Sequence, residues 1–155
     1  MCSWTERGQL PEYSLFIVVE PSIVPGSYVA VGTFQPGIEI WDCDVMDVIE
    51  PECVLGGLVE DKRRTLKPSS HTLAVMGLSA NPIYKYILWC GELIFRNILA
   101  SSSADKTVKL WDIPTQKCMI TMKEHKDKVQ GVSFHPYEAS ILATCMFWFL
   151  DGRCV

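Results

Sequence analysis

Two stretches of this chain, residues 28–42 and 98–112, repeat one pattern, and this repeat constrains the fold more than any other feature. Each has a short apolar run, a small polar turn, and alternating apolar residues that end in Trp-Asp. A third copy opens at His125, and its residues 141–144 (Ile-Leu-Ala-Thr) match residues 98–101 (Ile-Leu-Ala-Ser). In the second copy Val108 and Leu110 lie two residues apart, as on one face of a strand. The repeat predicts an all-β chain.

The second copy carries the fuller pattern. His71 comes before its first apolar run, and His125 opens the next unit. We expect strands and turns at residues 73–78, 98–102, 104–106 (turn), 108–112, 114–116 (turn) and 118–122. The pattern resembles a WD40 repeat, in which four strands form one propeller blade. The alternative is an unrelated β-sandwich in which the two Trp-Asp pairs are coincidental.

This resemblance implies a buried set of hydrogen bonds that links the turn to the strand beneath it. Asp105 would accept from His71, and His71 would meet the Ser101 hydroxyl. Ser101 would in turn accept from the indole N–H of Trp111. Each polar group needs a partner when it is buried. The structural set of the second repeat is therefore expected to be His71, Ser101, Asp105 and Trp111.

The two Trp-Asp dipeptides are Trp41-Asp42 and Trp111-Asp112. The first copy lacks the polar set, because Val31 and Gln35 stand where the second has a serine and an aspartate.

Four longer segments are similar to the periodic tryptophan protein 1 family: residues 28–32, 38–51, 96–112 and 125–139. The similarity covers most of residues 28–144, and the charged stretch 60–71 lies where that family has a lysine-rich and serine-rich loop. Members are WD-repeat proteins of the nucleus and nucleolus. The resemblance implies a role in ribosome production, ribosomal RNA transcription, chromatin and cell growth. It also implies partners in chromatin or pre-ribosomal complexes.

The chain departs from the family in two further places. A hydrophobic insert, residues 83–95, intrudes where a short turn is expected, and it lengthens the separation between His71 and Trp111. The third copy ends without an Asp turn or a Trp-Asp strand. We therefore expect a truncated or alternatively spliced member, with about two and a half four-stranded blades. Such a partial WD40 β-propeller cannot close, since rings have roughly four to eight blades.

The expected organisation has five parts. They are an N-terminal segment 1–27 with a possible first strand, a WD-like repeat 28–58, a charged loop 59–70, a WD repeat 71–124 that contains the insert 83–95, and an incomplete repeat 125–155 with a divergent tail.

Composition and motifs exclude several classes of function. No stretch reaches the roughly 18 apolar residues of a membrane span, and no basic, apolar leader follows Met1, so an intracellular protein is expected. Seven cysteines are scattered without a Cys-x-x-Cys pair, which argues against disulfides and metal sites. Nucleophile, phosphate-loop and zinc-protease motifs are missing, and Cys118 and His125 fall on blade positions. We expect a non-enzyme without a cofactor.

Charge divides the sequence unevenly. Residues 1–61 hold 11 acidic residues and one basic residue, whereas the rest holds 13 basic and seven acidic residues. The basic run Lys62, Arg63, Arg64 with Lys67 could contact a polyanion or act as a nuclear-import patch. An exposed loop kept soluble by charge is the alternative, favoured because no aromatic residue for base stacking lies nearby. The sequence thus predicts a non-catalytic interaction scaffold, with direct nucleic-acid binding through residues 62–67 as the alternative function.

Overall fold

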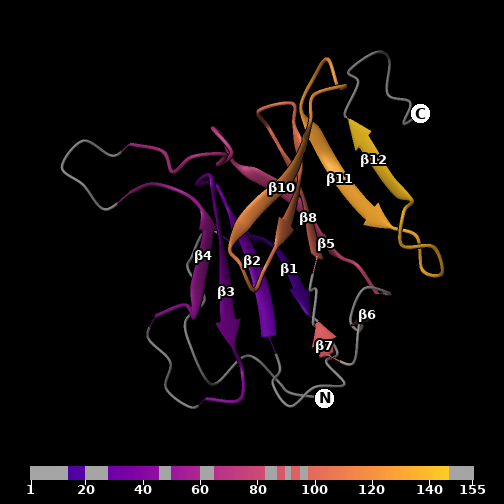
Figure 1. Cartoon of the computed structure of the whole chain (residues 1–155). Coiled ribbons are helices and arrows are strands. Elements are labelled where there is room, and N and C mark those ends of the chain that lie inside the picture. Colours follow the sequence, from indigo (N-terminus) through magenta and orange to yellow (C-terminus); the bar gives the residue numbers. More distant parts are fainter. Residues whose placement is uncertain are drawn as a thin grey trace.

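The computed structural model describes residues 14–19, 28–45, 50–59, 65–82, 87–89, 92–94 and 98–146, with the backbone alone for 14–19, 87–89 and 92–94. These residues form strands and turns without a helix (Figure 1). Within the described ranges, then, no helical segment has the length and apolar character needed to cross a membrane.

Ten of the twelve strands in the described ranges form three antiparallel sheets. The first has the order β1-β2-β3-β4, the second β10-β9-β8-β5, and the third pairs β11 with β12. Their bounds are β1 Ser14–Val19, β2 Tyr28–Thr33, β3 Gly37–Asp42, β4 Cys53–Gly56, β5 Val75–Ala80, β8 Ile98–Ser103, β9 Val108–Asp112, β10 Lys117–Met122, β11 Val129–Phe134 and β12 Leu142–Met146. Two four-stranded sheets and one two-stranded sheet confirm an all-β, partial and unclosed WD40 propeller.

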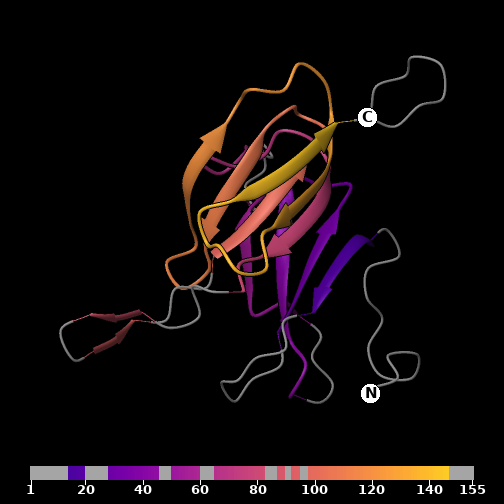
Figure 2. The same ribbon diagram turned by 90° about the vertical axis from the view of Figure 1, so that its right-hand side faces the viewer.

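The cores lie between neighbouring sheets, which stack against one another as Figure 2 shows. Residues of the first sheet, such as Ile38 and Leu55, pack with Leu99 and Trp111 of the second. A smaller cluster joins the second sheet to the third, through residues that include Ala100 and Phe134. The second sheet therefore packs against both of its neighbours, and the described apolar clusters lie between adjacent sheets, as in repeat proteins generally.

One predicted strand begins later than its sequence pattern indicates. The sequence pattern predicts a strand at residues 73–78, whereas β5 covers Val75–Ala80. Leu73 lies outside the strand with about half of its surface exposed. The Ser103 hydroxyl bonds the carbonyl oxygens of Leu73 and Ala74, at 3.3 and 2.7 Å. The apolar Leu73 thus belongs to the loop that leads into the strand.

The described part of the insert 83–95 forms a hairpin of its own, with β6 Ile87–Trp89 paired to β7 Glu92–Ile94. In Figure 2 this hairpin lies apart from the sheets. The flanking strands stay paired up to the insert, with Ala80 opposite Leu99 and a 2.9 Å bond from Asn81 N to Ile98 O. The insert therefore leaves the blade at the end of β5 far from His71.

A close approach of backbones sets the spacing between the second and third sheets. A Cβ on Gly77 of β5 would lie 2.9 Å from the carbonyl oxygen of Gln130 on β11, and 2.8 Å from Ser102 Oγ. We expect Gly77→Ala to lower the free energy of unfolding by about 1–3 kcal/mol through overpacking. Urea melts should show this loss, whereas Ser133→Ala, at an exposed position of β11, should change stability by less than about 0.5 kcal/mol. Equal midpoints for the two variants would contradict this packing.

Candidate functional site

A chain of hydrogen bonds joins four side chains of the second sheet. The indole Nε1–H of Trp111 on β9 donates to Ser101 Oγ on β8, at 2.8 Å. Ser101 Oγ lies 2.8 Å from Nε2 of His71, and Nδ1 of His71 lies 2.9 Å from Oδ2 of Asp105. The structure thus brings together all four residues that the resemblance to a WD40 repeat implies for this set. The donor order fits a neutral imidazole with its proton on Nδ1.

Burial makes this chain of bonds costly to break. His71, Ser101 and Trp111 have at most 1% of their surface exposed. A buried donor or acceptor that loses its partner costs about 1–3 kcal/mol, more than an average bond contributes. The set therefore holds the loop at His71 and the turn at Asp105 firmly against the sheet.

Asp105 is the most heavily bonded carboxylate in the described part of the chain. Its Oδ2 accepts from His71 Nδ1 and from Thr72 N, and its Oδ1 accepts from the backbone N and the hydroxyl of Thr107. Burial by itself would raise the pKa of this carboxyl. The hydrogen bonds from His71, Thr107 and Thr72 outweigh burial and hold the pKa of Asp105 well below its usual range. Sequence reasoning missed Thr72 and Thr107, because nothing in the repeat pattern distinguishes them.

The turn that carries Asp105 is fixed by its own backbone and by Ser103. Lys106 adopts a φ of 69°, in the left-handed region, and its N–H donates to Ser103 O at 3.3 Å. The Ser103 hydroxyl accepts from Asp105 N at 3.2 Å and donates to Ala74 O at 2.7 Å. The serines at positions 101–103 are all buried, and the hydroxyl of each makes at least one hydrogen bond.

The first sheet packs closely against the ring of Trp111 at Gly56. Gly56 of β4 has a φ of 66°, and a Cβ on it would lie 2.9 Å from Cη2 of Trp111 and 2.9 Å from Ser70 Oγ. A glycine suits both the positive φ and the close approach. The Ser70 hydroxyl accepts from Gly57 N at 2.8 Å, which ties the loop before His71 to the same place.

The other two copies hold only parts of this arrangement. Trp41 is half-buried, and its indole N–H donates to Glu39 Oε2 at 3.1 Å, while Val31 is fully buried. In the third copy His125 Nε2 lies 2.7 Å from Thr144 Oγ1, as His71 lies beside Ser101. The match of residues 141–144 to 98–101 was the signal for this second pair.

The aspartates of the Trp-Asp dipeptides are the last residues of β3 and β9, and each accepts a hydrogen bond from the residues that follow its strand. Asp42 Oδ1 accepts from Asp44 N at 2.9 Å, and Asp112 Oδ2 accepts from the Thr115 hydroxyl at 2.8 Å. The other carboxylate oxygen of Asp112 is buried and, within the described residues, has no partner.

The remaining candidate groups are less informative. Lys62, Arg63 and Arg64 lie outside the described residues, and Lys67 is exposed, with its backbone N–H bonded to Gly57 O at 2.9 Å. Cys118 Sγ contacts Ile120 O and the Thr121 hydroxyl, and not a histidine. Among the described residues no group of three or more His, Cys, Asp or Glu could hold a metal ion.

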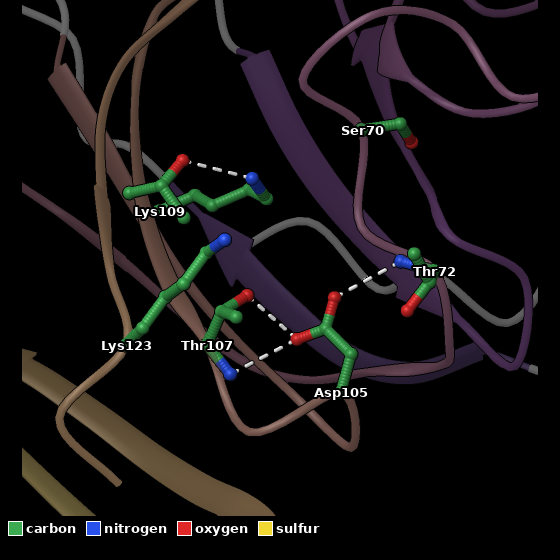
Figure 3. A pocket seen from close by; sticks show the side chains of 7 residues that line it. Ser70, Thr72, Asp105, Thr107, Lys109 and Lys123 are labelled. Atoms are coloured by element: carbon green, nitrogen blue, oxygen red, sulfur yellow. Dashed lines mark hydrogen bonds between the residues drawn. The ribbon is translucent and has the colours of Figure 1, made fainter.

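A polar hollow of about 330 Å³ opens beside Asp105, between the loop before β5 and the strands β9 and β10 (Figure 3). It is lined by Ser70, Thr72, Asp105, Thr107, Lys109, Thr121 and Lys123. Asp105, Thr72 and Thr107 line one side of the hollow, so the hydrogen bonds of the turn hold this part of its lining in place.

Comparison with known proteins agrees with this architecture. The family model described as "WD domain, G-beta repeat" matches residues 62–112 and 116–155. An uncharacterised WD repeat-containing protein of Schizosaccharomyces pombe is 43% identical over 101 residues, which are 61% of this chain and 17% of the relative. Periodic tryptophan protein 1 of Saccharomyces cerevisiae is 35% identical over 133 residues, 76% of this chain and 21% of the relative.

The homologue of periodic tryptophan protein 1 in Drosophila melanogaster is 36% identical over 121 residues, 77% of this chain and 24% of the relative. The chain thus spans about a fifth of the length of these curated relatives. Because the family model covers more than half of the chain, the chain belongs to the WD40 repeat family, and it is similar to periodic tryptophan protein 1.

Proposed function

We propose that this chain is a non-catalytic scaffold that binds other proteins through the loops and faces of its blades. The observation that supports this most directly is the buried chain of bonds from Trp111 to Asp105, which fixes surface loops on a rigid sheet. Loops held by a rigid framework are where binding residues concentrate. WD40 repeats generally serve as interaction surfaces, which also supports a scaffold function.

The resemblance to periodic tryptophan protein 1 supports a proposal for the cellular setting of this scaffold. We place it in the nucleus and nucleolus, in assemblies for ribosome production, ribosomal RNA transcription and chromatin-linked growth control. Similarity to the two periodic tryptophan proteins over about three quarters of this chain supports this assignment.

A second candidate function is direct nucleic-acid binding through Lys62, Arg63, Arg64 and Lys67. The exposure of Lys67 favours it, since an exposed ammonium can reach a phosphate. Phosphate contacts make affinity fall steeply between about 50 and 200 mM salt, whereas a protein–protein contact is less sensitive. Salt dependence therefore separates the two functions.

Capture from nuclear extract tests the scaffold. The tagged chain and full-length yeast periodic tryptophan protein 1 should retain an overlapping set of proteins after nuclease treatment. We expect a variant with Lys62, Arg63, Arg64 and Lys67 changed to Glu to fold normally, which its thermal unfolding checks. It should also capture the same proteins. If this variant or nuclease abolishes capture, direct nucleic-acid binding replaces the scaffold, and two unrelated sets of proteins would refute the ribosomal assignment.

A further inference from the structure

Lys109 is a buried cation with little to bind. Lys109 lies on β9, two residues before Trp111, and only 5% of its surface is exposed. Its ammonium donates to the Thr121 hydroxyl of β10 at 2.9 Å, and within the described residues no carboxylate forms an ion pair with it. An ammonium has three donors, and a buried charge is normally paired. The described structure leaves two of these donors for another group.

The free donors of Lys109 lie at the polar hollow beside Asp105. In Figure 3 the side chains of Lys109 and Lys123 extend in the same direction into this hollow, with Thr107 beside Lys123 and Asp105 bonded to Thr107. Lys123 is exposed, so its ammonium can reach an incoming ligand without rearrangement of the core. The hydroxyl of Thr72 adds a further donor at the rim.

Asp105 does not neutralise this pair of cations by direct contact. Both of its oxygens are already engaged, with two donors each. The charged groups that line the hollow are thus two ammonium groups and one saturated carboxylate, for a net charge of one positive unit. One carboxylate would balance that charge, whereas a doubly charged phosphate would leave the hollow negative.

We propose that this hollow binds the carboxylate of an aspartate or glutamate in an acidic segment of a partner protein. Lys109 donates from the floor, and Lys123 closes over the ligand from the rim. Ammonium–carboxylate bonds of this kind are about twice as strong as neutral ones, and more so in a partly buried hollow. The inference rests on the scaffold function and specifies the chemistry of one of its partners.

Binding of a fluorescent octaglutamate peptide to the full 155-residue chain tests this site, with octaglutamine as the uncharged comparison. We expect Lys109→Met and Lys123→Met each to weaken octaglutamate binding roughly tenfold, the loss of one charge-assisted bond. Methionine keeps the apolar stem of lysine, so packing along the strand is retained. Lys128→Met removes the same charge from an exposed lysine that does not line the hollow, and should change affinity less than about twofold.

Thermal unfolding of each variant shows whether Lys109→Met has altered the fold. If it has, the affinity of Lys123→Met, a substitution at an exposed position, tests the site instead. Equal losses in all three variants would overturn the site, because they would reflect overall charge alone. Equal binding of octaglutamine, or competition by an oligodeoxythymidine as strong as that by octaglutamate, would overturn it too. If the chain still captures the same proteins from nuclear extract in that case, the scaffold proposal is retained although the carboxylate site is rejected. The two proposals can therefore fail separately.

Discussion

Trp111→Ala should lower the free energy of unfolding by about 3–5 kcal/mol, the largest loss expected from a single side chain of this protein. The ring is 1% exposed and packs between two sheets, against Leu55 and Leu99 and directly beneath Gly56. Its removal leaves a cavity between the sheets. It also leaves Ser101 without the indole N–H that it accepts.

Trp41→Ala is the matched control for this experiment, since Trp41 ends the same pattern in the first copy. Trp41 is half-buried, as is Glu39, to which its indole N–H donates, so we expect a loss less than half as large. Urea unfolding followed by circular dichroism measures both. Equal losses would mean that the buried position of Trp111 does not set the stability of the second blade.

Asp105→Ala should cost about 1–3 kcal/mol, because it leaves two backbone donors unpaired at once. Thr72 N and Thr107 N lose their acceptor, whereas His71 Nδ1 and the Thr107 hydroxyl, which lie 3.2 Å apart, keep each other as partners. The matched control is Asp127→Ala, an exposed aspartate that accepts from Lys128 N, which should cost less than about 0.5 kcal/mol. If Asp105→Ala and Asp127→Ala unfold at the same urea concentration, the bonded turn contributes nothing to stability.

The same variant should show a changed response to acid. The folded-state pKa of Asp105 lies below its unfolded value of roughly 4, so its charged form stabilises the fold above that pH. That stability is lost as pH falls below about 4 toward the folded pKa. The gap in unfolding free energy between the wild type and Asp105→Ala should therefore be full at pH 7 and shrink as pH falls to about 3. A gap that is constant with pH would contradict a depressed pKa.

Much of the second blade could be predicted from the sequence because its signals are local. Alternation at Val108 and Leu110 and the turn before them indicate paired strands, and the resemblance to a WD40 repeat identified four polar residues that the structure brings together. Thr72 and Thr107 were missed, because no spacing pattern in the sequence marks the residues whose hydroxyl or backbone N–H bonds Asp105. Leu73 was assigned to a strand because an apolar residue in a bonded loop has the same pattern as one in a strand.

The sequence by itself determined that the chain consists of strands and that they recur in units ending at Trp41-Asp42 and Trp111-Asp112. These follow from side-chain periodicity and turn residues, which act over a few positions. Tertiary structure alone decided that the insert 83–95 leaves the blade at the end away from His71, so that the long separation in sequence does not separate His71 from Ser101. It also decided that Lys109 is buried in a hollow and that Gly56 covers Trp111, because burial and close approach depend on strands of different sheets meeting in space.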